Sequence, residues 1–382
     1  MANYDYEIVN GRKIRVRPKE TVSEIDKNGY FRRQPNHFTT PFGDGENDLK
    51  AEGNKRYRLV WAKLCHWSNR AAIVRELEGL EDQISVNMVE HAPHEKNLGW
   101  EYVYNENNID PVLGDQFLSE AYYRADDDYQ GRTTVPALID TTTGKVVNND
   151  YNWLTTYFEV NFRPWHKKGV PELYPVELRE EIDKMNLWLF DNINNAVYRS
   201  SFSRSNEGHF DGVNTFYAAM DHLEKRLETN RFLFGDYVTD SDIRLYVTLA
   251  RLDIRYTAQL GETKRPLYTY KNLWGYAKEL WEIPAFAHHT DFAAIIRQGR
   301  IEGEEDGFRA STHYDLALPK IDWDAQWKVS TERAYLSSDP THPIYLGNNR
   351  RFDIDPTWYD LGAESPKKEE KETPPSCGCC CG

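Results

Sequence analysis

The sequence predicts two folded units in series, an α/β domain followed by an all-α domain. Strand-like and helical patterns alternate from about residue 50 to 160, whereas only helical spacings recur from about 170 to 300. The 382 residues are enough for two ordinary cores. The expected organisation is an N-terminal arm over 1–48, the α/β domain over 49–160, the all-helical domain over 161–300, an extension packed on the body over 301–362 and a disordered tail over 363–382.

The elements of the first unit follow the order β-α-β-α-β-β-α, which is the plan of a thioredoxin-like domain. Tyr57, Leu59 and Trp61 recur at every second position, as in a strand, and Gly144 marks a hairpin turn. The expected strands are 56–63, 84–89, 133–140 and 145–147, and the expected helices are 68–79, 116–123 and a third that Asn149 or Asp150 caps and that ends near 158.

Apolar residues in the second unit recur at the spacing of amphipathic helices. Thr239 and Asp242 have the spacing of a capping box, which predicts a helix that begins between them. The first helical run contains Leu178, Ile182, Met185, Leu189 and Ile193, and further helices are expected over 210–227, 272–282 and 292–296.

Cys65 is the only cysteine in the first 376 residues, and it lies where the first strand gives way to a helix. Ser68 or Asn69 can cap that helix, which leaves Cys65 beside unpaired backbone N–H groups. Such a position favours the thiolate, which is a nucleophile. A lone intracellular cysteine is more often an inert packed side chain, so the placement at a helix end is what favours catalysis.

Pro136 opens the third main strand. In the thioredoxin-like plan a cis bond precedes this proline, and the backbone of the preceding residue, here Val135, pairs with a bound peptide-like ligand.

The composition excludes several classes of partner. The net charge of −14 disfavours nucleic acid and anionic membranes, and no apolar run approaches a membrane span. The N-terminus lacks the features of a signal peptide, so we expect a cytoplasmic protein. No Gly-rich phosphate loop follows a strand, which disfavours a nucleotide cofactor.

Four stretches resemble one family, the glutathionyl-hydroquinone reductases, also called xi-class glutathione transferases. Cys65-His66-Trp67-Ser68 stands where that family has Cys-Pro-Trp-Ala, and Arg70 follows, as an arginine does in the family. The other matching stretches are 134–140, 190–198 and 251–256, of which Asp191-Asn192-Ile193-Asn194-Asn195 is quite specific to this branch.

The resemblance implies the architecture of a glutathione transferase and a thiol-transfer reaction. Cys65 would attack the sulfur of a glutathionyl-quinol conjugate, a mixed disulfide would form, and a second thiol would release it. Glutathione or another low-molecular-weight thiol is the implied co-substrate, aromatic or quinone conjugates are the implied partners, and a homodimer is expected.

The resemblance also implies roles for particular residues. Tyr198 and Tyr256 match positions that line the aromatic-substrate pocket. Asp150-Tyr151 replaces the Glu-Ser pair of the family, and His66 replaces its proline. We expect His66 to point to solvent; the alternative is a protonated ring that favours the thiolate. The implied small-thiol site consists of Trp100, Arg132, Val135, Pro136, Asp150 and Tyr151.

The C-terminus carries a second group of cysteines, Cys377, Cys379, Cys380 and Cys381. Thiolates bind soft metals, so we expect either a metal-binding tail, a tethered thiol that reduces the Cys65 disulfide, or incidental thiols. The pairs His91/His94 and His288/His289 lack a completing ligand and are expected to be surface or structural. The alternative functions are a non-catalytic or metal-handling protein of the same fold and an S-conjugating transferase, although conjugating enzymes use Ser or Tyr.

Overall fold

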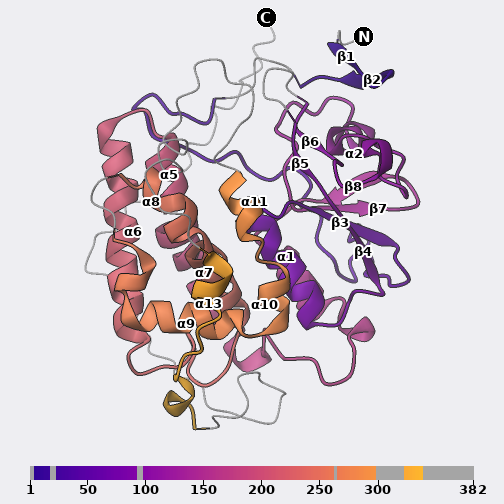
Figure 1. Cartoon of the computed structure of the whole chain (residues 1–382). Helices are drawn as coiled ribbons and strands as arrows, with labels where there is room; N and C mark the ends of the chain where they lie inside the picture. The colour runs from indigo at the N-terminus through magenta and orange to yellow at the C-terminus, as the bar shows by residue number, and fades with distance from the viewer. Residues whose placement is uncertain (1–3, 18–22, 93–97, 262–264, 298–321, 339–382) are drawn as a thin grey trace, which may run out of the picture.

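The computed structural model describes residues 4–17, 23–92, 98–261, 265–297 and 322–338. A small sheet and a helical bundle lie side by side, with helix α1 between them (Figure 1). The predicted fold class, a thioredoxin-like α/β domain followed by an all-helical domain, is confirmed.

The sheet has four strands in the order β4-β3-β7-β8. Strand β3 runs parallel to β4 and antiparallel to β7, and β7 forms a hairpin with β8. Every residue of β3 is buried because both faces of the sheet are covered. The bounds are Tyr57–Trp61 for β3, Ile84–Met88 for β4, Ala137–Asp140 for β7, Lys145–Asn148 for β8, His66–Leu77 for α1, Leu118–Ala125 for α2 and Leu154–Val160 for α3.

The alternation along β3 divides the core into two parts. Leu59 and Trp61 face the larger cluster, which is continuous with the helical domain. Val60 packs on the opposite face, in a cluster that also contains Trp100 and Val135. Cys65 packs against this second cluster, at the end of the sheet where β3 leaves it.

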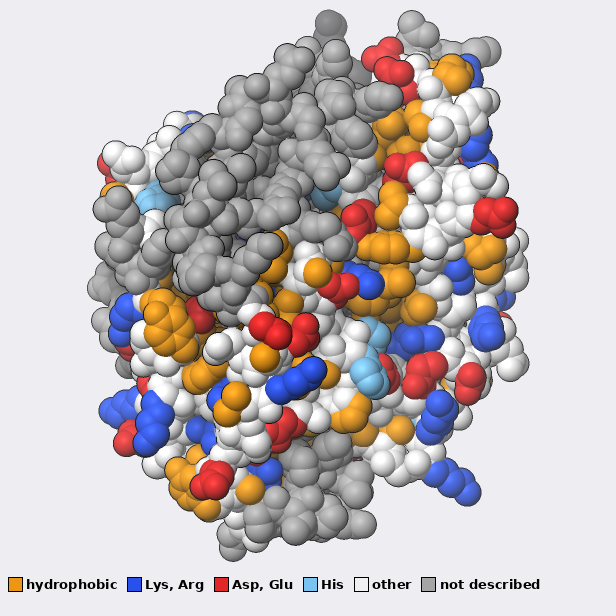
Figure 2. Space-filling model, viewed as in Figure 1, with side chains coloured by type: hydrophobic (Ala, Val, Ile, Leu, Met, Phe, Trp, Pro, Cys, Tyr) orange, Lys and Arg blue, Asp and Glu red, His pale blue; other side chains and the backbone are white. Residues whose placement is uncertain are grey.

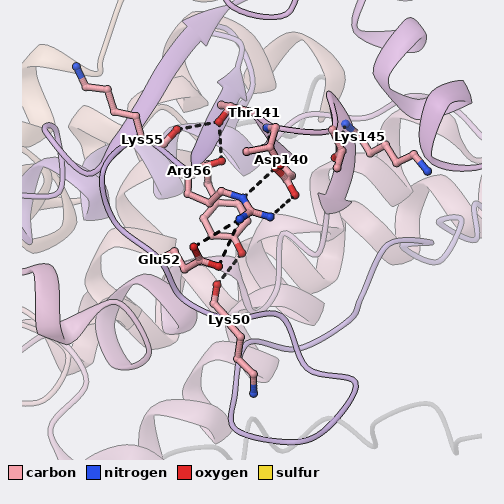
Figure 3. Close-up of polar contacts among 10 residues, drawn as sticks. Lys50, Glu52, Lys55, Arg56, Asp140, Thr141 and Lys145 are labelled. Carbon is pink, nitrogen blue, oxygen red and sulfur yellow. Dashed lines mark hydrogen bonds and ion pairs between the residues drawn. The ribbon is translucent and has the colours of Figure 1, made fainter.

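The end of the sheet opposite Cys65 is closed by polar contacts, shown in Figure 3. Arg56 lies just before β3 and donates to both carboxylate oxygens of Asp140, at 3.0 and 2.7 Å. Burial alone would raise the pKa of Asp140, but the hydrogen bonds from Arg56 and Thr142 outweigh it and lower the pKa to about 2. This ion pair joins β7 to the start of β3, at the end of the sheet away from Cys65.

The helical domain contains two π-helical turns, Phe190–Asn194 and Leu252–Tyr256, each following a regular helix. The predicted capping box is present: Thr239 is the N-cap of α7, and Asp242 accepts from its backbone N–H at 2.8 Å. The helices are α4 Arg179–Leu189, α5 Ala196–Phe202, α6 Asn206–Arg226, α7 Asp240–Arg251, α8 Thr257–Gln259, α9 Lys271–Trp281, α10 Pro284–His288, α11 Phe292–Arg297 and α13 Trp323–Trp327.

Helix α7 is buried along its whole length and packs against α1, so it joins the two domains. Asp240 and Arg244 form a buried ion pair at 2.6 Å near its start. The described part of the C-terminal extension packs on the helical domain through Trp327, which is buried against Trp274 and Phe292. None of the helices within the described ranges is long and apolar enough to cross a membrane.

Several local expectations differ from the structure. Helix α1 begins at His66 rather than at Ser68, because the Ser68 hydroxyl bonds the Ala62 backbone instead of capping the helix. The arm, for which the sequence predicted no strands, contains a hairpin, β1 Tyr6–Val9 and β2 Arg12–Arg15. A second short pair, β5 Glu90–His91 and β6 Trp100–Glu101, lies in the insertion after β4. Such short strands give too little alternation to be read from sequence.

Candidate active site

Cys65 is itself the N-cap residue of α1, with φ −86° and ψ 116°. Its sulfur accepts no capping bond; instead the thiol donates to the Val135 carbonyl oxygen at 3.7 Å. The side chain is partly exposed, so the sulfur is not sealed in apolar packing. A reachable sulfur therefore lies at the N-terminus of α1.

Arg251, the last residue of α7, holds the turn that leads to Cys65. It is buried and donates to the carbonyl oxygens of Lys63 at 3.1 Å and Leu64 at 3.0 Å. The same guanidinium bonds the side-chain oxygen of Asn69 on α1. Burial lowers the pKa of Arg251, and the side chains of Tyr256 and Cys65, which become negative when ionised, oppose this effect. Arg251 therefore both positions the thiol and supplies positive charge to it.

Arg70 is the second buried cation near the sulfur. It lies one turn into α1 and donates to the Tyr151 carbonyl oxygen at 2.8 Å. Burial lowers its pKa to about 9, aided by Arg244, whereas a negative Cys65 raises it. A pKa of about 9 leaves Arg70 charged at neutral pH, and Arg70 and Arg251 are both buried guanidinium groups that interact electrostatically with Cys65.

Arg33 reaches the same place from the N-terminal arm. Its guanidinium lies 4.3 Å from the ring centroid of Tyr198 and 4.8 Å from that of Trp67, which are cation–π distances. Its Nε donates to Asn195 at 2.9 Å, and its buried Nη2 has no partner within the described residues. The arm thus contributes a cation with an unused donor to an aromatic surface.

Aromatic rings form one continuous wall beside the thiol. Trp67 lies 4.6 Å from Tyr151 and 5.6 Å from Phe190, measured between ring centroids. Tyr198 lies 5.9 Å from Trp67, so the wall extends from the α/β domain into the helical domain. A flat aromatic molecule matches such a surface in shape and polarisability.

Tyr198 and Tyr256 place phenol groups at this wall, close enough for each to affect the pKa of the other. Burial raises the pKa of Tyr198, and a negative Cys65 raises it further. Burial also raises the pKa of Tyr256 well above 10, with Tyr198 the next cause. Both phenols are therefore protonated at neutral pH and available as hydrogen-bond donors.

The two π-helical turns explain how these tyrosines reach the site. Tyr256 is the last residue of the second turn, and Tyr198 follows the first turn by one helical turn. A π turn inserts one residue into a helix and rotates everything after it, a device common at functional sites. Both turns fall in stretches that the sequence singled out by resemblance.

Of the predicted small-thiol residues, Val135 and Trp100 lie in the apolar cluster that Cys65 packs against, whereas Tyr151 belongs to the aromatic wall. The Val135–Pro136 bond is cis, and the Val135 amide donates to no acceptor within the described part of the chain. Trp100 packs in the same apolar cluster as Val135 and Cys65, and its ring lies 4.0 Å from that of His91. An open backbone amide beside a tryptophan suits an extended peptide-like ligand.

Asp150 and Arg132 are engaged by the arm. One oxygen of Asp150 accepts from Asn36 at 2.9 Å and from the Asn152 amide at 3.0 Å, and its other oxygen has no partner within the described residues. Arg132 pairs with Glu24 at 2.8 Å. The structure thus brings Asp150 beside Tyr151 and the aromatic wall, whereas Arg132 is occupied by an arm carboxylate.

The expectation that His66 points to solvent is wrong. The side chain is only 1% exposed, and its ring lies against Trp67 and Tyr198, with centroids 4.2 and 5.3 Å away. Burial lowers its pKa well below 6.5, and Arg251 lowers it further. The ring is therefore neutral at pH 7, which also excludes a protonated His66 as the group that favours the thiolate. Packing against α7, which no local pattern reports, causes this burial.

Arg33 and Arg251 are site residues that the sequence did not reveal as such. Arg251 was noticed only within a resembling stretch, and Arg33 lies in an arm without periodicity. A buried arginine is recognisable only once its acceptors are known, and those acceptors belong to other elements.

The remaining candidates lie elsewhere. A cleft of about 280 Å³ opens near α10, lined in part by Trp61, Lys63 and His289, and Cys65 is not among its lining residues. His288 and His289 both face Glu76, at 2.7 and 3.0 Å. No set of three or more metal-ligating side chains occurs within the described ranges. Cys377, Cys379, Cys380 and Cys381 lie outside the described residues, so their metal-binding role stays a prediction.

The face of the molecule drawn in Figure 2 carries charged side chains of both signs. Figure 2 shows acidic and basic side chains interspersed over the described part, without a field of one sign.

Comparison with known proteins decides the family. The glutathione S-transferase C-terminal domain model matches residues 197–279. Glutathione S-transferase omega-like 2 of Schizosaccharomyces pombe is 35% identical over 280 residues, which cover 70% of this chain and 88% of that protein. Glutathionyl-hydroquinone reductase YqjG of Escherichia coli is 32% identical over 240 residues, covering 63% of this chain and 73% of that protein. The crystal structure of the xi glutathione transferase of Phanerochaete chrysosporium superposes with a TM-score of 0.64 at 33% identity, covering 69% and 90% of the two chains.

The chain belongs to the xi-class glutathione transferases, the glutathionyl-hydroquinone reductase family. In this xi-class chain the helix-capping Cys65, the cis-proline loop and the two phenols all come from elements that the fold places at the domain boundary. The glutathione-bound structure of YqjG is also similar, with a TM-score of 0.64 at 30% identity, covering 78% of this chain and 96% of that one.

Proposed function

We propose that this xi-class protein is a thiol-dependent reductase that removes a glutathionyl group from aromatic quinol conjugates, with Cys65 as the nucleophile. The observation that carries the proposal is the position of the sulfur. It is partly exposed at a helix N-terminus, near two buried guanidinium groups and two phenols. The relatives YqjG and PcpF carry the name glutathionyl-hydroquinone reductase, which supports the same reaction class.

The cis-proline loop is the proposed binding edge for the small thiol. A glutathione-like tripeptide in extended conformation would accept from the free Val135 amide and lie along Trp100. The unpaired oxygen of Asp150 would bind an ammonium group at the γ-glutamyl end. This places the sulfur of the ligand next to Cys65, whose thiol already lies 3.7 Å from the Val135 carbonyl oxygen.

The aromatic wall is the proposed site for the quinol ring. Tyr198 and Tyr256 would donate hydrogen bonds to a ring oxygen, because both are protonated at neutral pH. Arg33 would lie over or beside the ring, where its unpartnered Nη2 is a further donor. These groups stabilise negative charge on the oxygen as the carbon–sulfur bond breaks.

The reaction then balances in two exchanges. The Cys65 thiolate forms a disulfide with the conjugate sulfur, the carbon–sulfur bond breaks, and one proton from water converts the departing ring to the free quinol. A second small thiolate attacks the mixed disulfide, which restores the Cys65 thiolate and releases an oxidised dimer of the small thiol. Over the two exchanges the ring carbon gains two electrons, and the conjugate sulfur and the sulfur of the second thiol each lose one.

Intact-mass measurement tests this function. Incubation with a glutathionyl-quinol, with no added thiol, should add one glutathionyl group to the wild type and none to Cys65→Ser. Turnover by Cys65→Ser should fall by about 10³-fold or more. An unmodified wild type would contradict the proposal, and transfer of glutathione to an electrophilic chloroaromatic by both proteins would favour the S-conjugating alternative.

A further inference from the structure

His66 is a buried polar side chain that the proposed reaction does not yet use. It follows Cys65 directly, is 1% exposed, and packs against both tyrosines of the aromatic site. Its ring centroid lies 5.3 Å from Tyr198 and 6.0 Å from Tyr256. A polar ring in this position either has a structural partner for each nitrogen or keeps one nitrogen for a ligand.

The hydrogen bonds around Nδ1 indicate the tautomer of the ring. The Asn194 amide nitrogen donates to the Arg244 carbonyl oxygen and to the Thr248 hydroxyl, both at 2.8 Å. The Thr248 hydroxyl accepts this hydrogen bond and lies 3.3 Å from His66 Nδ1, to which it can donate its own proton. We assign Nδ1 as the acceptor, which puts the single proton of the neutral ring on Nε2.

The charges around the ring keep it neutral. Burial is the largest cause that lowers the pKa of His66, and the cations Arg251, Arg70 and Arg33 lower it further. Asp240, a buried carboxylate of α7, pairs with Arg244 rather than with the imidazole. A neutral ring with its proton on Nε2 offers one fixed N–H donor.

That donor has no acceptor. Nε2 of His66 is buried and has no hydrogen-bond partner within the described residues. An unpaired buried N–H is costly, so the protein gains by supplying it with an oxygen at some stage of its cycle. The groups beside it, Tyr198 and Tyr256, are themselves donors that the proposed function assigns to a quinol oxygen.

We propose that His66 Nε2–H is a third hydrogen-bond donor to the ring oxygen of the aromatic substrate, and that it makes the enzyme selective for oxygen-bearing aromatic conjugates. This inference rests on the proposed function. As Cys65 takes the conjugate sulfur, the electron pair of the broken carbon–sulfur bond passes into the ring and toward this oxygen. The N–H bond stabilises that charge without giving up its proton, and water supplies the proton that the ring carbon gains.

Two substitutions at His66 test the donor. His66→Phe keeps a flat ring without a donor, and His66→Gln keeps an N–H near the Nε2 position. The measurement is the second-order rate constant for adduct formation on Cys65, with a glutathionyl-quinol and, separately, with glutathione disulfide, which has no aromatic oxygen. The value for the glutathionyl-quinol divided by the value for glutathione disulfide should fall by about 10- to 100-fold in His66→Phe. His66→Gln should recover a substantial part of the loss.

The outcomes separate this inference from simpler explanations. Equal losses with both substrates would show that His66 only positions Cys65, and an unchanged quotient would show that water satisfies Nε2; either result overturns the proposal. A wild type that forms no Cys65 adduct would overturn the proposed function instead. In that case the affinity for the free quinol still decides the role of His66, because loss of the donor should weaken binding in His66→Phe and not in His66→Gln.

Discussion

Replacing Arg251 with Met tests whether this residue holds the catalytic turn. The buried guanidinium makes four hydrogen bonds, to the Lys63, Leu64 and Val247 carbonyl oxygens and to the Asn69 side chain. Met keeps most of the aliphatic volume but leaves these acceptors without a donor. Hydrogen bonds to charged groups contribute about 1.5–3 kcal/mol each, and the desolvation of the buried charge offsets part of the sum.

We therefore expect the free energy of unfolding to fall by about 3–5 kcal/mol in Arg251→Met. Urea unfolding followed by tryptophan fluorescence measures this change. Alkylation of Cys65 by iodoacetamide at neutral pH should also slow, because the variant removes a positive charge from the thiolate.

Arg265→Met is the matched control. Arg265 pairs with Asp221 on the surface, where both side chains are about half exposed, 47% and 57%. An exposed pair contributes about 0–1 kcal/mol, so the control should remain close to the wild type. A loss of less than about 1 kcal/mol in Arg251→Met, or faster alkylation of its Cys65, would refute the role of Arg251 in holding the Cys65 turn.

Three further predictions concern stability. Burial raises the pKa of Glu159 well above 4.5, and neither carboxyl oxygen has a partner within the described residues. Above pH 4.5 the unfolded chain loses this proton while the folded protein keeps it. The free energy of unfolding of the wild type should therefore fall by about 1.4 kcal/mol per pH unit until the carboxyl of the folded protein ionises. Glu159→Gln should remove this loss, and parallel unfolding profiles between about pH 5 and 8 would contradict it. Gly29→Ala should destabilise by about 1–3 kcal/mol, because φ is +82° and the new Cβ would lie 2.9 Å from the Ser205 backbone nitrogen. Gly11→Ala has a similar φ of +78° but no atom within 4 Å of the new Cβ, so it should lose only the stability that backbone strain costs. Thermal unfolding measures both variants. Arg333→Met removes a buried guanidinium that donates to three carbonyl oxygens. It should lower the free energy of unfolding, measured in urea, by about 3 kcal/mol or more. A change below about 1 kcal/mol would show that the C-terminal extension does not anchor the helical domain.

The local patterns of the chain predicted most of the fold. Alternation in 56–63 and the Thr239/Asp242 capping box depend on neighbours within a few residues, and the structure reproduces both. The small hairpin of the arm was missed because four-residue strands carry too few alternations.

The candidate site was predicted only in part. Cys65, Val135, Tyr198 and Tyr256 were identified, and the structure brings them together. Arg33 was missed because it lies in a segment without a period, and its role depends on contacts with distant aromatic rings.

The sequence by itself determined where the thiol lies, at the junction of a buried strand and a helix. The local spacing of hydrophobic residues predicts that junction. Only the tertiary structure decided the surroundings of that thiol. The packing of α7 against α1 buries His66, and it carries Arg251 to the Cys65 turn. Burial and electrostatic effects depend on tertiary contacts between side chains that are distant in sequence, and the spacing of residues along the chain does not predict those contacts.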